Sequence, residues 1–570
     1  MVAPKVTELF PSYSARTQPR IRVANLLVQT LGELGVDTFY GIPGGAISSV
    51  YDALIDFPNA RVINARHESG AVFMAMGHAR SGGSLPCVLM TSGPGITNAL
   101  TGLAAAHADG VPLIAIGGEV PKKNFGRGAL QEGSRYHLDI LGMARSVTKY
   151  ATELTNPRAV ATTIRRAVAT ALSGKQGPVL LSLPLDVGNE EVIPTRSPTQ
   201  VSTSFGIDHD VVAAAAEALM SSRRAVILAG SGARNPEAVR LIGVLAASLQ
   251  IPVITTPKAK GLFPETDPLS LGVFGVGGHP SALEYLEGGI DTILCVGCGL
   301  GETGTNSWSP LLQASNAFIQ IDIDATQIGK NYHVDYGIVG PAQLVLRELA
   351  ARISRRPTAA PATGIRYYEP EKMEQDTTPI EPARAIKLLQ LKMPESTIFT
   401  SDVGEHLIYA LHYLRIENPG SFIANTGLGS MGSGIGAAIG AKVANPKRPV
   451  VSICGDYGFQ MFGMEIASCV ENRIGVVFAI FNDARMRMVE GGMRTIFGRT
   501  PKVDSQRVDF SLLARSVGAN GYLIRSAEDL DRVPRQHLVG DIPCVLDFEI
   551  NPDASFPVNG RVTQIKNFSN

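Results

Sequence analysis

The sequence has little charge and little aromatic surface, and each shortage excludes a class of protein. Lys plus Arg (51) equals Asp plus Glu (51), so the formal net charge is zero, and charged residues make up only 18% of the 570 residues. A chain without excess charge has no long-range field for capturing nucleic acid or an anionic membrane surface. Because it contains a single Trp, recognition does not depend mainly on aromatic side chains. We therefore expect neither nucleic acid nor a membrane as a partner.

Cysteines and long apolar stretches are also scarce. The six cysteines are scattered, which is typical of reduced, buried thiols and not of a disulfide framework. Cys295 and Cys298 form a C-x-x-C pair at the end of an apolar run, and we favour packing over metal or redox chemistry for it. Residues 1–20 lack the apolar core of a signal peptide, and no stretch approaches ~18 consecutive apolar residues. These features predict a cytoplasmic protein with a loose N-terminal arm.

Glycine, in contrast, is abundant, with 60 residues in the chain. Many glycines follow short apolar runs, as in "GIPGGA", "TSGPGITN", "GLGSMGSGIG" and "GDYGF". Glycine permits positive φ and close backbone approach, which both a phosphate cradle and a tight strand-to-helix turn require. Each cluster alone is therefore a weak signal, and its place in the fold decides between the two interpretations.

Three blocks of alternating helical patterns and short apolar strands follow one another along the chain. Such alternation predicts α/β architecture with parallel sheets covered on both faces. We therefore expect three doubly wound parallel-sheet domains, the first and third being distant copies of one fold. The expected divisions are an N-terminal arm (1–20), a first domain (21–194), a central domain (205–353), a linker (354–378) and a third domain (379–570).

Two acidic residues of the third domain are expected to meet in space. Strand 450–454 leads to Asp456, a helix is predicted over 459–470, and strand 475–481 leads to Asp483. A right-handed β-α-β crossover brings the two strand ends to the same edge of the sheet. Adjacent carboxylates repel unless a cation lies between them, and hard oxygen ligands suit Mg²⁺. The alternative is a pair of solvated turn residues.

These motifs carry a resemblance to a known family. "GDYGF" followed by "FND" resembles the thiamin diphosphate (ThDP) binding signature, with Tyr457 replacing its usual third residue and Asp483 its second Asn. "YGIPGGAI", "RHESGA", "TSGPGITNALTGLAAAHADGVPLIAIGGEV" and "ALQE" resemble the first domain of the acetolactate synthase family. "DIDATQIGKN" resembles its central domain, and "VGEH" and "GLGSMGSGIGAAIGA" its third. The resemblance covers roughly residues 21–549.

The resemblance implies a role for each matching residue. Glu68 would hydrogen-bond the aminopyrimidine ring of ThDP and so promote loss of the thiazolium C2 proton, which requires an apolar site. Gln131 and the backbone N–H of Gly45 would orient reacting oxygens. Met431 would separate the two cofactor rings. Mg²⁺ would be held by Asp456, Asp483 and the backbone carbonyl of Arg485, and further cofactor contacts are expected from Pro43, Asn98, Val403, Gly404, Glu405, His406, Gly429, Gly455, Tyr457, Gly458 and Met488.

The chain departs from acetolactate synthase at several positions. Residues 297–303 ("GCGLGET") lack the Arg of the family's FAD-contacting stretch, and Lys175 replaces a second Arg. Loss of these bidentate groups argues against FAD binding. Gly492 replaces a Trp of the substrate pocket, which removes on the order of 150–250 Å² of aromatic surface. A substrate-channel Lys is replaced by Leu185, and an inserted segment adds Arg135, Tyr136 and His137.

These observations favour a ThDP- and Mg²⁺-dependent carboligase that decarboxylates a 2-oxo acid and joins the acyl unit to a second 2-oxo acid or an aldehyde. The departures favour a partner bulkier than pyruvate, and Arg135, Arg485 or Arg487 could bind its carboxylate. The alternatives are acetolactate synthase itself or a ThDP-dependent decarboxylase or aldehyde lyase. In this family Glu68 and the Mg²⁺ motif of one site come from different subunits, which implies a homodimer or homotetramer.

Two further classes remain open at this point. The segment "GLGSMG" (427–432) satisfies the G-x-G-x-x-G pattern of a nicotinamide-dependent dehydrogenase, although it leaves Glu68 and Asp483 unexplained. A catalytically inactive binding paralogue is the other.

Overall fold

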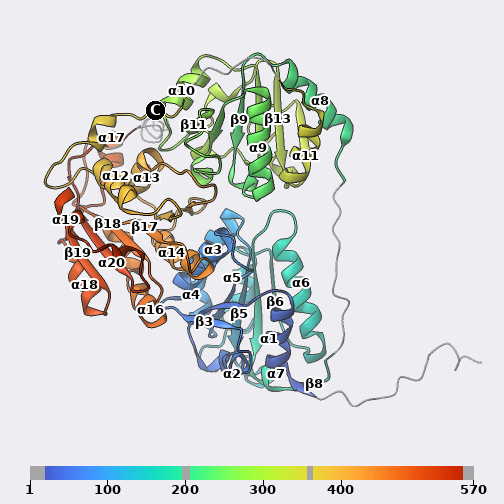
Figure 1. Ribbon diagram of the computed structural model, residues 1–570. Coiled ribbons are helices and arrows are strands. Elements are labelled where there is room, and N and C mark those ends of the chain that lie inside the picture. The colour runs from blue at the N-terminus through green and yellow to red at the C-terminus, as the bar shows by residue number, and fades with distance from the viewer. Residues whose placement is uncertain (1–19, 195–205, 356–363, 556, 558–570) are drawn as a thin grey trace, which may run out of the picture.

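The chain contains three six-stranded parallel sheets with helices around them (Figure 1). The computed structural model describes residues 20–194, 206–355, 364–555 and 557. Residues 1–19 of the predicted arm lie outside these ranges, as do parts of the two predicted connecting segments. The prediction of three doubly wound parallel-sheet domains is confirmed. The domain limits given above remain our proposed divisions of the chain.

The first sheet has the strand order β3-β2-β4-β5-β7-β6. Its strands are β2 (Thr38–Gly41), β3 (Arg61–Asn64), β4 (Cys87–Met90), β5 (Leu113–Glu119), β6 (Tyr150–Glu153) and β7 (Pro178–Pro184). β2, β4, β5 and β7 are buried along their whole length, as expected for a parallel sheet covered on both faces. The helices are α1 (Val23–Glu33), α2 (Ser48–Ile55), α3 (Glu68–Arg80), α4 (Pro94–Asp109), α5 (Ile140–Arg145), α6 (Val160–Leu172) and α7 (Leu185–Asn189), and β1 (Ile21–Arg22) pairs with β8 (Glu191–Val192).

The central sheet has the order β11-β10-β9-β12-β13-β14, which is the arrangement of dinucleotide-binding folds. The strands are β9 (Ala225–Ala229), β10 (Val253–Thr255), β11 (Ser270–Val273), β12 (Thr292–Val296), β13 (Ala317–Asp322) and β14 (Tyr336–Val339). The helices are α8 (His209–Ser221), α9 (Pro236–Leu249), α10 (Pro280–Glu287) and α11 (Ala342–Arg352).

The third sheet repeats the topology of the first. Its order is β16-β15-β17-β18-β20-β19, so in both sheets the strands, numbered along the chain, follow the pattern 2-1-3-4-6-5. This agreement supports the prediction that the two domains are copies of one fold. The strands are β15 (Ile398–Ser401), β16 (Phe422–Ala424), β17 (Val450–Gly455), β18 (Val477–Asn482), β19 (Asn520–Ile524) and β20 (Cys544–Glu549).

The third domain also contains more helices than the other two. The single helix predicted over 459–470 is in fact two, α15 (Asp456–Phe462) and α16 (Glu465–Asn472), and the first begins at Asp456 itself. The break falls after Gly463, whose close contacts with Phe459 leave no room for a side chain. The remaining helices are α12 (Pro382–Lys392), α13 (Glu405–Tyr413), α14 (Ser433–Ala444), α17 (Arg487–Phe497), α18 (Phe510–Ser516), α19 (Ala527–Asp531) and α20 (Arg535–Val539).

Helices α3 and α14 join the first and third domains at the centre of the molecule (Figure 1). Small residues allow their backbones to meet. A Cβ atom on Gly77 would lie 2.0 Å from the carbonyl oxygen of Ala437, and one on Gly440 would lie 1.7 Å from that of Met74. Only glycine fits at these two positions. The one large core that spans both domains includes residues of both helices.

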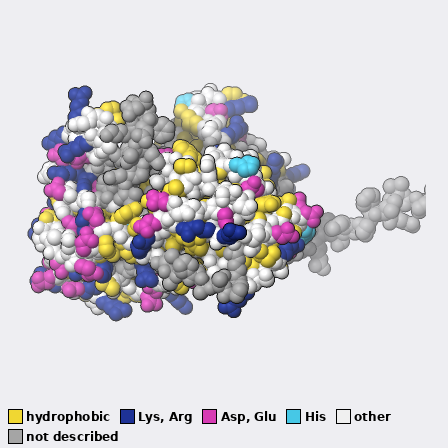
Figure 2. Space-filling view, turned by 90° about the horizontal axis from the view of Figure 1, so that it is seen from above, with side chains coloured by type: hydrophobic (Ala, Val, Ile, Leu, Met, Phe, Trp, Pro, Cys, Tyr) yellow, Lys and Arg dark blue, Asp and Glu magenta, His cyan; other side chains and the backbone are white. Residues whose placement is uncertain are grey.

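The surface agrees with the balanced composition. Figure 2 shows one face on which basic and acidic side chains are intermixed, without a large patch of one sign. In the described ranges, no helix has both the length and the apolar character needed to cross a bilayer.

Candidate active site

The predicted site residues of the third domain lie at the point where the strand order of the sheet changes direction. In the strand order 2-1-3-4-6-5, the connection after the first strand leads to one side of the sheet, and the connection after the third strand leads to the other. These two adjacent strands are β15 and β17. Ligands of open α/β sheets bind beyond the carboxyl ends of such strands. The loop after β15 contains Val403 and Gly404, and β17 ends at Gly455, just before Asp456. The structure therefore brings together the predicted diphosphate and metal residues.

Asp456 and Asp483 are neighbours, as predicted. β17 and β18 pair in parallel with Gly455 opposite Phe481, so each aspartate follows its strand within two residues of this pair. The two residues are only 4% and 9% exposed. Burial and, secondarily, the charge of Asp483 raise the pKa of Asp456 to about 7. Oδ1 of Asp456 accepts a hydrogen bond from the Tyr457 N–H (2.8 Å), whereas its Oδ2 is buried without a partner among the described residues.

The backbone between the predicted metal ligands turns sharply. Ala484 has a φ of +59°, a conformation that few non-glycine residues adopt and that is common at functional sites. The following N–H, from Arg485, donates to Oδ1 of Asp483 at 3.2 Å. Asp483 is therefore fixed by its own turn, with its second oxygen directed to other partners.

Arg487 offsets part of the acidic charge. Its Nε lies 3.6 Å from Oδ2 of Asp483, and its Nη2 lies 3.5 Å from Oε1 of Glu405. Its guanidinium also donates to the carbonyl oxygens of Asn551 and Ala554. Because two acidic side chains already pair with its guanidinium, we no longer count Arg487 among the candidates for binding a substrate carboxylate. Arg485, by contrast, is exposed.

Two side chains of the "VGEH" motif have unused polar atoms. Oε2 of Glu405 and Nε2 of His406 are buried without partners among the described residues. Burial raises the pKa of Glu405 to about 7 and lowers that of His406 to about 4, so His406 is neutral at physiological pH. Gly404 makes room for this ring, because a Cβ atom there would lie 2.6 Å from its Cε1.

A bound diphosphate linked to a metal ion would provide partners for these buried polar atoms and for the carboxylates of Asp456 and Asp483. Buried polar atoms without partners are rare and call for a ligand. Carboxylate oxygens match the preference of Mg²⁺, which takes phosphate oxygens and water as its other ligands. The residues present therefore fit ThDP with Mg²⁺.

Asp402 is a structural residue of the site that the sequence analysis missed. It is fully buried and accepts hydrogen bonds from the backbone N–H groups of Gly432 (2.8 Å) and Gly434 (3.1 Å). It thereby ties the loop that carries Met431 to the end of β15. A Cβ atom on Gly458 would lie 2.2 Å from its Oδ2. Its position in "SDVGEH", an acid at the end of an apolar strand, was the signal available.

The first domain repeats this arrangement at the carboxyl edge of its own sheet. The segments that follow the adjacent strands β3, β2, β4 and β5 carry the predicted residues, in loops or at the beginning of the next helix. Glu68 begins α3, is 7% exposed, and its Oε2 accepts a hydrogen bond from Nδ2 of Asn98 at 3.0 Å. Pro43 and Gly45 follow β2, and Gln131 follows β5.

Glu465 of the third domain holds the beginning of α3. Its carboxylate oxygens accept hydrogen bonds from the N–H of Arg66 (3.1 and 3.0 Å) and of His67 (3.1 Å), just before Glu68. A Cβ atom on Gly70 would lie 2.2 Å from its Oε1. Glu465 is 1% exposed, and burial raises its pKa to about 7. The sequence analysis missed this residue, because its partners lie almost 400 positions away.

The remaining predicted residues, which come from the first and third domains, are less buried. Gln131 is exposed with a φ of +64°, and its backbone lies against Gly93 at the start of α4. Pro43 and Gly45 are also exposed. Partly buried positions are Gly429, Met431, Tyr457 and Met488.

The positions that depart from acetolactate synthase also differ in environment. A Cβ atom on Gly492 in α17 would meet no atom within 4 Å. In the inserted segment, the Arg135 guanidinium stacks over the exposed Tyr136 ring at 4.8 Å. Lys175 is exposed and Leu185 is partly buried.

The glycines of the central domain are largely explained by packing. A Cβ atom on Gly230 would lie 2.3 Å from the carbonyl oxygen of Gly297, and one on Gly297 would lie 2.6 Å from the Ala233 nitrogen. Cys295 and Cys298 are free, buried thiols, in agreement with the packing interpretation. Across the described ranges, no group of three or more His, Cys, Asp or Glu side chains is arranged to hold a metal.

Comparison with known proteins agrees with this geometry. Residues 21–139 match the N-terminal TPP-binding domain of thiamine pyrophosphate (ThDP) enzymes, residues 212–349 their central domain, and residues 402–548 their C-terminal TPP-binding domain. A probable acetolactate synthase large subunit of Methanocaldococcus jannaschii is 36% identical, covering 95% of this chain and 94% of its own length. An acetolactate synthase of Mycobacterium bovis is 33% identical (93% and 88%), and an acetolactate synthase large subunit of Lactococcus lactis is 32% identical (87% and 87%). The dehydrogenase interpretation is wrong, because its glycine motif lies inside a ThDP-binding domain.

Proposed function

The chain belongs to the thiamine pyrophosphate enzymes and is related over most of its length to acetolactate synthases, and on that premise we propose that it is a ThDP- and Mg²⁺-dependent carboligase. It would decarboxylate a 2-oxo acid and join the acyl unit to a second 2-oxo acid or an aldehyde. The observation that carries the Mg²⁺ assignment is the buried pair Asp456 and Asp483, with one oxygen unpartnered, at the switch point of the third sheet.

ThDP, when bound, supplies the electron sink for cleavage and formation of bonds to an acyl carbon. In our proposal Asp456, Asp483 and the Arg485 carbonyl hold Mg²⁺, and the neutral Nε2 of His406 faces the diphosphate. Glu68 exchanges a proton with the aminopyrimidine end of the cofactor. Its carboxylate is shielded from water and oriented by Asn98, which suits a proton-transferring group.

The acceptor is the less constrained part of the proposal. The open space beside Gly492 supports an acceptor larger than pyruvate, such as an aryl or alkyl pyruvate or an aldehyde. Arg135 and the exposed Arg485 are the candidates that remain for its carboxylate. We also propose that the central domain does not bind FAD, since residues 297–303 contain no Arg and nearby glycines are used in packing.

A product screen tests the proposal. The purified enzyme with ThDP and Mg²⁺ is incubated with pyruvate alone, with aryl pyruvates alone, and with each in combination with an aldehyde, and the CO₂ and organic products are identified by mass spectrometry. We expect a carbon–carbon ligated product whose yield is highest with a bulky acceptor. Acetolactate as the main product in every mixture would identify acetolactate synthase itself, and release of aldehyde without ligation would refute the carboligase assignment. No turnover of any mixture would favour the inactive paralogue.

We further propose that the enzyme is a homodimer or homotetramer with each active site shared between two chains. Two observations support this arrangement. Within one chain, Glu68 is oriented by Asn98 of its own domain, while the acidic pair lies on a different sheet. A Cβ atom on Gly429, in the loop next to Met431, would face open space within the single chain.

A further inference from the structure

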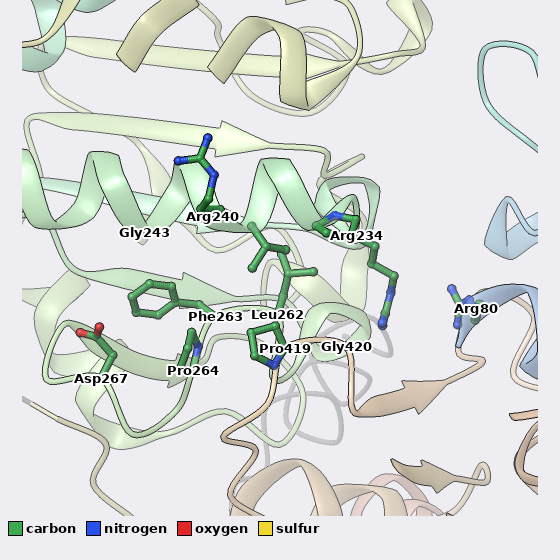
Figure 3. Close-up of a pocket in the computed structure, with 12 residues that line it drawn as sticks. Arg80, Arg234, Arg240, Gly243, Leu262, Phe263, Pro264, Asp267, Pro419 and Gly420 are labelled. Atoms are coloured by element: carbon green, nitrogen blue, oxygen red, sulfur yellow. The ribbon is translucent and has the colours of Figure 1, made fainter. Parts of the chain in front are cut away.

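A cavity lined by arginines lies where the three domains meet. Its volume is about 470 Å³, within the usual range for small-molecule sites. Its lining combines one face of α9, the segment 262–267, the loop that contains Pro419 and Gly420, and Arg80 at the end of α3 (Figure 3). None of the lining residues is one that we assign to ThDP, Mg²⁺ or substrate. The inference below does not depend on the proposed function.

Arg234 enters this cavity without a counter-ion. Its Nη1 donates to the Phe422 carbonyl (3.3 Å) and its Nη2 to the Lys258 carbonyl (2.5 Å), while its Nε is buried without a partner. Among the described residues, no carboxylate lies within ion-pair distance of it. Burial and the nearby charge of Arg80 lower the pKa of Arg234 to about 9.

Arg80 faces Arg234 and shares the carboxylate of Asp109 with Lys258. Figure 3 shows the two arginine side chains extending toward each other from opposite sides of the opening. Arg80 is 6% exposed, and its Nη2 lies 3.8 Å from Oδ1 of Asp109. The same oxygen lies 3.3 Å from Nζ of Lys258 and accepts the Gly427 N–H at 3.1 Å. Two cations therefore share one acidic side chain, and together with the unpaired Arg234 the cluster carries excess positive charge in a partly desolvated place.

The rest of the cavity is mainly apolar. Its walls include Leu262, Phe263, Pro264 and Pro419, and the one acidic lining residue, Asp267, is occupied by the Leu269 N–H at 2.8 Å. Guanidinium groups recognise carboxylate and phosphate by paired hydrogen bonds. We propose that this cavity is a binding site for a small organic anion, with its carboxylate or phosphate between Arg234 and Arg80 and its apolar body against the Leu262–Pro264 wall.

Binding there would act on all three domains at once. Arg80 is the last residue of α3, whose first residue is Glu68, and α3 is locked against α14 by the glycine contacts described above. Arg234 belongs to the central domain and bonds to a carbonyl at the start of β16 of the third. An anion between the two arginines would offset their repulsion and so stabilise the junction.

Calorimetric titration of the ThDP- and Mg²⁺-loaded enzyme with phenyl phosphate tests the site. Phenol and inorganic phosphate serve as probes of the apolar and anionic parts alone. We expect phenyl phosphate to bind with a Kd below about 1 mM, each fragment to bind at least about tenfold more weakly, and Tm to rise with phenyl phosphate concentration. Absence of binding by phenyl phosphate, or equal binding of phosphate alone, would overturn the proposal.

Two variants and a control locate the bound probe. Arg234→Gln should weaken phenyl phosphate binding at least about tenfold, because a neutral amide replaces the charged fork. Gly243→Leu places a side chain in the cavity and keeps both Arg234 and Arg80; a Cβ there meets only Phe263 at 3.9 Å, so the variant should remain folded and weaken binding similarly. Arg223→Gln, at an exposed arginine of the same domain, should leave binding unchanged. ThDP affinity should be unaltered in all three; undiminished phenyl phosphate binding in Gly243→Leu would refute this location.

Discussion

At the scale of single residues, the proposed active site is built from carboxyl groups that water hardly reaches. Burial raises the pKa values of Asp402 to about 6 and of Glu405, Asp456 and Glu465 to about 7. Their polar partners are of three kinds. Backbone N–H groups bind to Asp402 and Glu465, Arg487 lies near Glu405, and one oxygen of Asp456 has no partner among the described residues. Such clusters of perturbed acids are typical of functional sites.

Glu68→Gln should abolish most of the turnover without unfolding the protein. The amide has the same shape but cannot exchange the proton, so we expect kcat to fall about 100-fold to 10,000-fold. The binding of ThDP, measured by calorimetry, should change much less than kcat. Glu217→Gln, at an exposed position on α8, is the matched control and should be fully active. Activity of Glu68→Gln close to that of the wild type would contradict the role of Glu68.

Glu465 gives the stability of the cofactor-free enzyme a definite pH dependence. Its pKa is about 7 in the folded chain against an ordinary value of 4.5, so between these values the native state holds a proton that the unfolded state has released. Unfolding free energy therefore falls as pH rises through this window, by at most about 3 kcal/mol from this group.

Glu465→Gln removes this titration. Denaturant unfolding between pH 4.5 and 7.5 should show a shallower decline of unfolding free energy in the variant than in the wild type. At the acidic end of the range Glu465 is protonated and, like Gln, accepts mainly through one carbonyl oxygen, so the two proteins should have similar stabilities there. Parallel pH profiles of the two proteins would show that Glu465 has an ordinary pKa.

Residues of the site differ in how far the sequence could reveal them. Asp456 and Asp483 were predictable because each ends a strand of one β-α-β unit, and parallel pairing then fixes their neighbourhood. Glu465 was not, because its partners are backbone N–H groups almost 400 positions away, and the one signal for Asp402 was its place at the end of an apolar strand. For Arg487, only the three-dimensional structure shows that two acidic side chains already occupy its guanidinium.

At the scale of elements, the contact between α3 and α14 determines where Glu68 lies. Amphipathic patterning does not explain it, since nearly every residue of both helices is buried. The contact is made by glycines that let one helix backbone approach the other. The helix that begins with Glu68 is therefore placed by positions as remote from Glu68 as Gly440.

Gly440→Ala should be severely destabilising. A Cβ atom there would lie 1.7 Å from a backbone oxygen of Met74, so one helix must move, and we expect a loss of more than about 3 kcal/mol in unfolding free energy. Gly32→Ala is the control, because Gly32 lies within α1 and nothing is within 4 Å of its added Cβ. There alanine should stabilise by about 0.5–1 kcal/mol. Denaturant unfolding measures both, and equal stabilities would show that α3 and α14 are less closely packed.

The edge strands and the short pair β1 and β8 at the domain boundary give the weakest signal in the sequence. β6, β11, β14 and β19 each lie at an outer edge of a sheet. Central parallel strands read as continuous apolar runs because both faces are covered, whereas an edge strand can keep polar residues. β6 ("YATE") is only partly buried throughout, and β14 and β19 are mixed. The sheet centres, where the site lies, were therefore predicted better than the edges.

At the scale of the whole molecule, the first and third domains present equivalent edges. The shared strand pattern 2-1-3-4-6-5 places Glu68 and Asn98 on one edge and the acidic pair on the other. A cofactor with two chemically different ends suits such a pair of edges, one for the pyrimidine and one for the metal-bound diphosphate. The sequence showed this duplication only as a repeated alternation of strands and helices, because strand order depends on long-range pairing.

The central structural claim of our proposal is that one active site takes Glu68 from one chain and the acidic pair from another, and mixing two inactive variants tests it most directly. Glu68→Gln and Asp456→Ala are each expected to be inactive. When they are unfolded together, refolded and reloaded with ThDP and Mg²⁺, a mixed dimer contains one site with both wild-type groups. Random pairing should restore about a quarter of the wild-type activity. Activity that stays at the level of the separate variants, in a sample shown to contain mixed dimers, would contradict the claim and place both groups of each site within a single chain.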